Sequence, residues 1–177
     1  IKKCNKPELF DLFGYSETTD TISSNLSNLK ICFGHYGGDD EWKKFLERDR
    51  DNYSHKMSNN SNGIEFLNPQ NPNLSYGRLM DIWKNADWYT IISSLMIQYP
   101  KVYADLSYII HDQEIIPLLK HTLRNESLKN KVLFGTDFYV VRNHNSEKDL
   151  LAQTMANLSS EEFDLIARDN PINYLKN

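Results

Sequence analysis

The stretch KICFGHYGGDDEW, Lys30 to Trp42, decides the fold of this chain. An apolar run ends abruptly at His35, and Gly37, Gly38 and three acidic residues follow it. A strand interior disfavours glycine and a protein core disfavours an unpaired imidazole, so this change marks the point where a buried strand leaves the core. We therefore expect His35 to stand at the mouth of a site.

Two later segments share the pattern of β-branched and aromatic residues that ends in a polar residue. The three predicted strands are KICFGH over residues 30–35, KVYADLS over residues 101–107 and KVLFGTD over residues 131–137. Helical patterns lie between them, and this alternation predicts parallel strands joined by right-handed crossovers. The sequence thus predicts a single α/β domain over residues 1–177.

Apolar spacing and residues typical of helix ends place the helices. The clearest helix lies in residues 85–100, which Pro100 ends, and another within residues 112–124 is expected to begin near Pro117. Further helix starts are predicted at Ser146, at the Ser159 and Glu162 capping box, and at Asn170-Pro171. The helix after Ser146 carries a stripe of Leu150, Leu151, Thr154, Met155 and Leu158.

Residues 49–76 depart from this alternation, because they are rich in Asn, Ser and Pro and poor in apolar residues. They predict a long loop or insertion in the first crossover. Such a loop either covers a site or forms a surface excursion.

The composition is that of an ordinary globular domain, with 40% hydrophobic and 25% charged residues. A net charge of −4 without a long basic block argues against a nucleic-acid surface. The apolar runs are shorter than the roughly 18 residues that a membrane helix needs. Cys4 and Cys32 are the only cysteines, and we expect two free thiols in a soluble, cytoplasmic protein.

His35 and Asp137 both end predicted strands, and the carboxyl ends of parallel strands meet at one edge of a sheet. Imidazole and carboxylate suit a metal ion or general acid–base chemistry near neutral pH. Gly37 and Gly38 would let the backbone pass close to a bound substrate. The alternative is a structural histidine and an aspartate that caps a helix, and spacing leaves both possibilities open.

Four segments in the same order resemble the C-terminal part of the amidohydrolase-related family of metal-dependent hydrolases and decarboxylases. They are LKICFGHYGG, YPKVYADLS, VLFGTDF and IARDNPINYL. In that family the sixth strand ends in a histidine followed by glycines, and the eighth strand ends in an aspartate. The resemblance, over roughly residues 29–175, implies strands six to eight with their helices from a metal-dependent hydrolase (β/α)8 TIM barrel.

The resemblance also implies roles for individual residues. His35 corresponds to a catalytic group in the decarboxylase-like branch and to a metal ligand in other amidohydrolases. Asp137 corresponds to the aspartate that touches the metal and handles the proton of the attacking water. The implied cofactor is a divalent metal, with Zn²⁺ as the default, and the implied substrate is a small molecule. Asp105 and Ser107 match the seventh strand, either as a structural network or with a direct role.

The sequence departs from the family because it has no His-x-His pair, which the family places on its first strand. We therefore expect a partial barrel that is inactive in isolation and whose open sheet edge favours association, with itself or with another chain. Among the other histidines, His111 and Glu114 fit a surface pair on one helix face. His144 follows the third predicted strand and could lean over the site.

Two other functions stay open. One is a small α/β domain that binds an anion at the turn GHYGG, although Asp39, Asp40 and Glu41 would repel phosphate. The other is a scaffold or subunit that keeps the barrel sequence without its metal ligands. Metal content of the full-length protein distinguishes a scaffold from an enzyme.

Overall fold

The computed structural model describes residues 29–47 and 86–176. By its contacts the chain divides into two units, residues 1–30 and residues 31–177, and all of the described helices and strands belong to the second unit. The loop predicted over residues 49–76 and the predicted free thiol of Cys4 lie outside the described residues.

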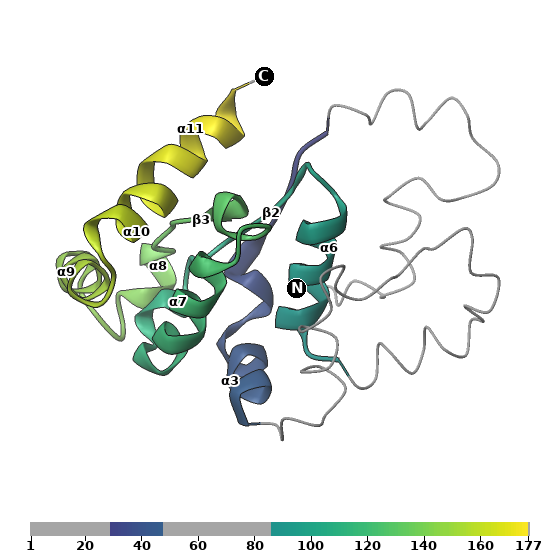
Figure 1. The fold of residues 1–177 in the computed structure, drawn as a ribbon. Coiled ribbons are helices and arrows are strands. Elements are labelled where there is room, and N and C mark those ends of the chain that lie inside the picture. Colours follow the sequence, from purple (N-terminus) through teal and green to yellow (C-terminus); the bar gives the residue numbers. More distant parts are fainter. Residues whose placement is uncertain (1–28, 48–85, 177) are drawn as a thin grey trace, which may run out of the picture. The chain divides into compact units, whose positions relative to one another are not determined.

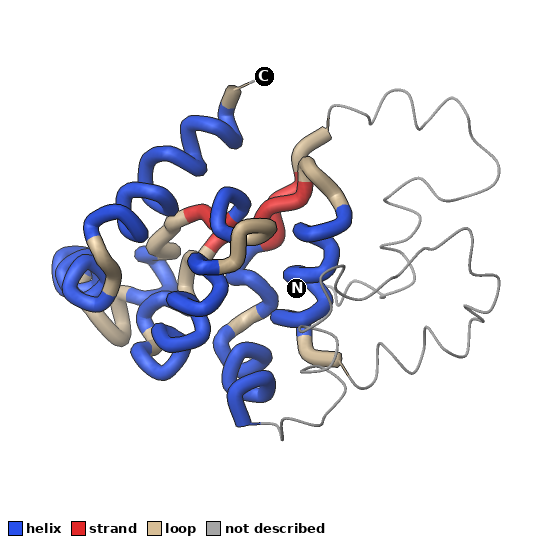
Figure 2. The backbone as a smooth tube through the Cα atoms, in the orientation of Figure 1, coloured by secondary structure: helices blue, strands red, loops and turns tan. Residues whose placement is uncertain are grey.

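A short parallel sheet lies among helices (Figures 1 and 2). Its strands are β1 (Ile31–Phe33), β2 (Val102–Asp105) and β3 (Val132–Leu133), with β2 in the centre. Both pairings are parallel, as the sequence predicts for an α/β fold.

All three strands end earlier than predicted. After β1 the backbone enters a tight turn over Gly34–Gly37. After β3 the N–H of Phe134 donates to the carbonyl of Ile166 in a helix, at 2.9 Å, instead of continuing the ladder. His35 and Asp137 therefore lie beyond the strands and not on their last residues.

Figure 1 labels the α-helices of the described residues. They are α3 (Asp39–Glu47), α6 (Trp88–Gln98), α7 (Ile116–Arg124), α8 (Phe138–Val141), α9 (Glu147–Asn157), α10 (Ser160–Asp164) and α11 (Asn170–Leu175). Single 3₁₀ turns cover Ile109–His111, Gln113–Ile115 and Lys129–Lys131, and a π-helical turn covers Leu165–Asp169. The turn over Gly34–Gly37 has non-helical angles at His35 and Tyr36.

The predicted helix within residues 85–100 is confirmed as α6. The carboxylate of Asp87 caps it by accepting the N–H of Thr90 at 2.7 Å. Eight consecutive residues of α6, Tyr89 to Met96, are buried, so all sides of this helix are covered. At its C-terminal end the Lys131 ammonium donates to the carbonyls of Met96 and Tyr99, which offsets part of the cost of burying that charge.

Other predicted helix starts are also confirmed. Pro117 lies in the first turn of α7, where its missing N–H is not needed. The Ser146 hydroxyl accepts the N–H of Asp149 and caps α9, and Ser159 with Glu162 forms a complete capping box on α10.

The stripe predicted on α9 is wrong in part. Leu150, Thr154 and Leu158 are buried, but Leu151 is 38% and Met155 is 54% exposed. Buried positions four residues apart form one narrow line along a helix. The helix therefore packs along a single seam, and the wider face that the sequence predicts is not used.

The acidic run after the glycines begins a helix that the sequence pattern did not predict. Asp39, Asp40 and Glu41 form the first turn of α3, where negative charge is stabilised by the helix dipole. The Glu41 carboxylate also accepts the backbone N–H of Trp88 at 2.9 Å, and so ties α3 to the start of α6. These acids thus have a structural role at two helix ends.

The C-terminal helices dock on the edge strand through a π-helical turn. A π turn pairs each carbonyl with the N–H five residues ahead, and for Ile166 that residue is Pro171, which has no N–H. The freed Ile166 carbonyl accepts the N–H of Phe134 instead. The short helix predicted at Asn170-Pro171 is confirmed as α11, which follows the π-helical turn directly.

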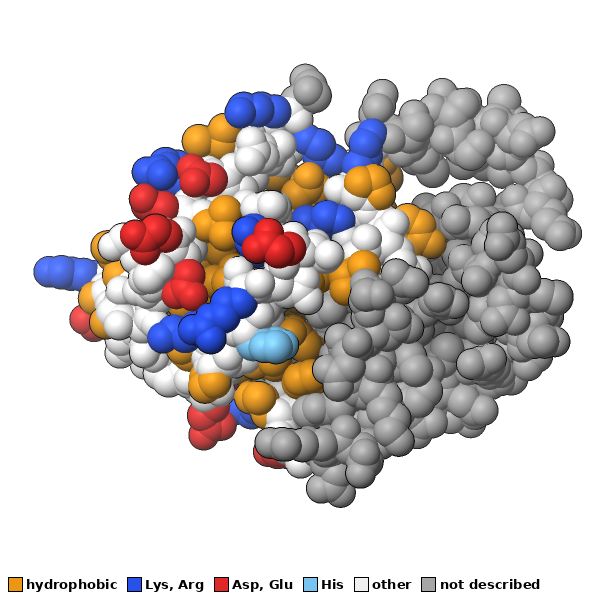
Figure 3. Space-filling model, in the orientation of Figure 1, with side chains coloured by type: hydrophobic (Ala, Val, Ile, Leu, Met, Phe, Trp, Pro, Cys, Tyr) orange, Lys and Arg blue, Asp and Glu red, His pale blue; other side chains and the backbone are white. Residues whose placement is uncertain are grey.

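On the face drawn in Figure 3, acidic and basic side chains are interspersed over the described residues. None of the described helices combines the length and the apolar character needed to cross a membrane.

Replacing Asn170 by alanine should lower the free energy of unfolding by about 1–3 kcal/mol. Its side-chain amide is buried and donates to the carbonyls of Lys129 and Val132, at 2.7 and 2.8 Å, so the variant leaves both acceptors without this donor. Asn173→Ala, an exposed position on the same helix, should change stability by less than about 0.5 kcal/mol. Urea unfolding measures both variants, and equal effects would contradict the docking role of Asn170.

Candidate functional site

The turn after β1 separates two neighbouring side chains. His35 and Tyr36 both adopt left-handed backbone angles, with φ of 58° and 41°, which residues other than glycine rarely adopt. The Tyr36 side chain is fully buried, whereas His35 is exposed. The tight turn therefore directs tyrosine into the core and leaves the imidazole at the end of the strand.

Tyr36 is held in the core by an aromatic cluster. Its ring stacks on Tyr89 with centroids 5.6 Å apart and meets the edge of Trp42 at 5.0 Å. The Ser93 hydroxyl donates to the carbonyl of Tyr89, so the Tyr36 hydroxyl is the donor in its 2.9 Å bond to Ser93. Burial raises the pKa of Tyr36 well above its ordinary range, so the phenol stays neutral and anchors the turn.

The two glycines have structural reasons for their presence. Gly37 has a φ of 87°, and a Cβ there would lie 2.6 Å from the Cβ of Trp88, so no other residue fits without movement. Gly38 has a φ of 100°, and its N–H donates to the carbonyl of His35 at 2.7 Å. Contact of Gly37 and Gly38 with a substrate stays a prediction.

Asp105, at the end of β2, binds the turn after β1 to the central strand. One carboxylate oxygen accepts the backbone N–H groups of His35 at 3.2 Å and Ser107 at 3.0 Å, and also the Ser107 hydroxyl. The other oxygen accepts the Cys32 thiol at 3.7 Å. This carboxylate therefore joins the ends of two neighbouring strands.

The His35 ring lies between the loops that follow β2 and β3. Its Nδ1 is 2.9 Å from the carbonyl oxygen of Ser107, which can only accept, so Nδ1 is the donor in this bond. Its Nε2 lies 3.8 Å from a carboxylate oxygen of Asp137. The structure thus brings together His35 and Asp137, the two residues that the sequence singled out.

Asp137 precedes α8, yet its side chain accepts no capping hydrogen bond from that helix. Its backbone is left-handed, with φ and ψ both 46°, and its side chain is 29% exposed. The helix-capping explanation for this residue therefore fails.

Backbone strain is concentrated at the three strand ends. Within the described residues, left-handed φ angles outside glycine occur at His35, Tyr36, Tyr108 and Asp137. Tyr108 forms a γ-turn with φ of 63° and ψ of −62°, closed by the N–H of Ile109 and the carbonyl of Ser107 at 2.7 Å. Such conformations cost roughly 1–3 kcal/mol each and cluster at functional sites.

The separation of His35 and Asp137 suits one shared metal ion. Bonds from zinc to imidazole nitrogen and carboxylate oxygen are roughly 2.0–2.2 Å, so atoms 3.8 Å apart can both reach one ion. No group of three or more His, Cys, Asp and Glu residues that could hold a metal occurs in residues 29–47 and 86–176. The described residues thus offer two ligands, and a third would have to come from elsewhere.

A row of aromatic rings leads away from His35. Tyr108 meets the edge of His35 at a centroid distance of 5.8 Å and contacts His111 at 4.7 Å. His144 stacks on His111 at 5.3 Å, so it lies against His111 and not against His35. No pattern in the sequence indicated that Tyr108 would border the site.

The predicted surface pair of His111 and Glu114 on one helix face is wrong. The two residues lie in separate 3₁₀ turns, because Asp112 breaks the run and its carboxylate caps the second turn. Glu114 forms an ion pair with Lys43 of α3 instead. The Lys43 ammonium lies 3.7 Å from the Glu114 carboxylate and 2.5 Å from the Asp112 carboxylate.

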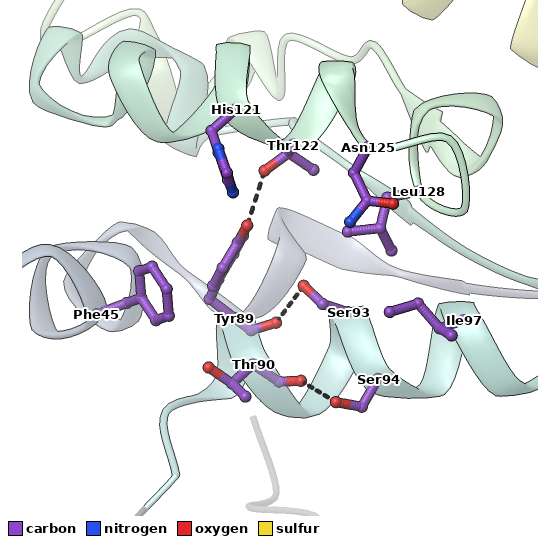
Figure 4. Close-up of a pocket in the computed structure, with 10 residues that line it drawn as sticks. All are labelled: Phe45, Tyr89, Thr90, Ser93, Ser94, Ile97, His121, Thr122, Asn125 and Leu128. Atoms are coloured by element: carbon purple, nitrogen blue, oxygen red, sulfur yellow. Dashed lines mark hydrogen bonds between the residues drawn. The ribbon is translucent and has the colours of Figure 1, made fainter. Parts of the chain in front are cut away.

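A separate pocket lies between α3, α6 and α7, and Figure 4 shows the side chains that face it. Tyr89 and Thr122 join its two walls through a 2.9 Å hydrogen bond between their hydroxyls. The cavity of about 30 Å³ has room for roughly two water molecules. Its lining does not include His35 or Asp137.

The chain was compared with protein-family models, with curated proteins and with solved structures, and none of them matches it. We therefore infer function from the side chains that follow the three strands.

The Cys32 thiol should react very slowly with alkylating reagents near pH 8. Burial, followed by the charge and hydrogen bond of Asp105, raises its pKa from 9.0 to about 12, which makes the reactive thiolate about a thousandfold scarcer at pH 8. Labelling of the Cys4→Ser protein with iodoacetamide, followed by mass spectrometry, measures this rate. Rates that match those of the urea-unfolded chain would contradict a partly buried, neutral thiol.

Proposed function

We propose that this chain contributes His35 and Asp137 to the active site of a metal-dependent hydrolase or decarboxylase of the amidohydrolase type. The α/β fold with a small parallel sheet would then correspond to strands six to eight of a (β/α)8 barrel. The substrate is a small molecule, and the reaction is hydrolysis of a C–N or related bond or a non-oxidative decarboxylation.

The observation that carries the proposal is the convergence of two side chains from opposite edges of the sheet. His35 follows β1 and Asp137 follows β3, and β2 lies between these strands. Even so, Nε2 of His35 and a carboxylate oxygen of Asp137 are only 3.8 Å apart. Both residues hold strained backbone angles, which supports a functional reason for this placement.

The two side chains have distinct chemical abilities. With its proton on Nδ1, His35 presents a lone pair on Nε2 that can bind a divalent cation or accept a proton. The Asp137 carboxylate can bind the same cation or take the proton of a water molecule that attacks the substrate. A bound divalent ion would supply Lewis acidity that polarises the substrate and favours ionisation of water. The further ligands that such an ion needs lie outside the described residues or on another chain.

The proposal predicts that His35→Ala and Asp137→Asn each weaken zinc retention in the full-length protein by about tenfold or more. His121→Ala is the matched control, because His121 is exposed at the separate interhelical pocket and should leave zinc binding unchanged. Dialysis against graded zinc buffers followed by elemental mass spectrometry measures retention, and circular dichroism checks the fold.

Activity provides the second readout on the same variants. A screen of small amides for released amine, and of small carboxylic acids for released carbon dioxide, distinguishes hydrolysis from decarboxylation. Turnover that depends on zinc and is lost in both site variants supports the proposal. Full-length protein that binds zinc no better than its His35→Ala variant would favour a scaffold or binding domain instead.

A further inference from the structure

Among the described residues, the two hydrogen-bonding neighbours of the His35 Nδ1 atom both belong to Ser107. The carbonyl oxygen of Ser107 lies at 2.9 Å and its hydroxyl oxygen at 3.0 Å. The carbonyl can only accept a hydrogen bond. The role of the hydroxyl depends on where its single hydrogen goes.

Asp105 settles the role of that hydroxyl. A carboxylate only accepts, so the Ser107 hydroxyl donates its hydrogen to Asp105 and presents a lone pair to His35. The backbone N–H of Ser107 and that of His35 donate to the same carboxylate oxygen, at 3.0 and 3.2 Å. Nδ1 of His35 therefore faces two acceptors, and a proton on Nδ1 satisfies both of them.

The loop that presents Ser107 is itself fixed. The Ser107 carbonyl uses one lone pair for the γ-turn bond to Ile109, which leaves the other for His35. On the opposite side, a Cβ at Gly135 would lie 3.0 Å from the Cβ of Ser107, so the loop after β3 packs closely against this serine. Ser107 therefore has little freedom to move away from the imidazole.

We propose that Asp105 and Ser107 are positioning residues that hold the proton of neutral His35 on Nδ1 and so leave the Nε2 lone pair, 3.8 Å from the Asp137 carboxylate, free for a cation that both side chains can reach. Free histidine in water carries its proton mainly on Nε2, so the arrangement selects the less favoured tautomer. That tautomer is the one that can bind a cation through Nε2. The use of this tautomer for metal binding rests on the proposed function. The tautomer itself can be measured in the metal-free chain.

The test is the position of the His35 ring proton, measured by long-range ¹H–¹⁵N NMR on ¹⁵N-histidine-labelled full chain above the pH at which histidines protonate. Comparison with the His35→Ala spectrum assigns the signal. We expect the wild-type proton on Nδ1. A wild-type proton on Nε2 would overturn the proposal before any positioning variant is made.

Variants at Asp105 then test the cause. In Asp105→Ala the ratio of the Nδ1–H to the Nε2–H tautomer should fall about tenfold, which corresponds to the loss of one hydrogen bond. Asp105→Asn keeps an acceptor oxygen for the two backbone N–H groups and should retain most of the Nδ1–H form. Asn125→Ala is the control, because the Asn125 side chain accepts the N–H of Ser127 in the same local geometry, away from His35.

An unchanged tautomer ratio in a folded Asp105→Ala protein would overturn the positioning role. Zinc affinity separates this inference from the proposed function. If the wild-type proton lies on Nδ1 and moves in Asp105→Ala, the positioning role stands whether or not the full-length protein binds zinc. We expect Asp105→Ala to weaken zinc retention by about 10–100-fold, and unchanged retention would contradict the link between tautomer and metal.

Discussion

The burial of Tyr36 is the interaction on which the arrangement of the strand ends depends. Its ring fills the space between Tyr89 and Trp42, and its hydroxyl finds a partner in Ser93 of α6. Because adjacent left-handed residues direct their side chains apart, a tyrosine anchored in the core leaves the preceding imidazole at the edge of the sheet. The energy of aromatic burial thus compensates for a strained turn that would otherwise relax.

Asp105 extends this constraint to the rest of the site. By accepting N–H groups from the residues that follow β1 and β2, the carboxylate fixes the distance between two loops that are separated by 70 residues in sequence. The loop after β3 lies close to these two loops because Gly135, which has no side chain, packs directly against Ser107. The backbone of His35 is thus anchored on Asp105, and the loop that carries Asp137 packs closely on Ser107.

Much of the local structure could be predicted from the sequence. The helix capped by Asp87 and the capping box at Ser159 follow from short-range chemistry that a sequence displays directly. The positive φ of Tyr108 could not be predicted, because tyrosine rarely adopts it and gives no signal for it. Aspartate adopts left-handed angles more often, but the sequence does not show that Asp137 is where this happens.

The α3 helix was not predicted, because acidic residues after two glycines suggested the polar mouth of a site. In the structure the helix dipole of α3 stabilises these acids, and Glu41 also accepts the N–H of Trp88 at the start of α6. Similarly, the apolar side chains of Leu151 and Met155 predict buried positions, yet both are exposed. Only the packing in three dimensions shows that α9 contacts the rest of the protein along the side that carries Leu150. The sequence indicated that His35 and Asp137 are candidate site residues, but only the structure shows that their side chains lie 3.8 Å apart.

The most direct test of the account is anomalous diffraction from zinc-soaked crystals of the full-length protein. We predict a zinc ion within roughly 2.0–2.2 Å of both Nε2 of His35 and a carboxylate oxygen of Asp137, with Nδ1 still bonded to Ser107. Zinc bound only at other residues, or bound to His35 through Nδ1, would contradict it.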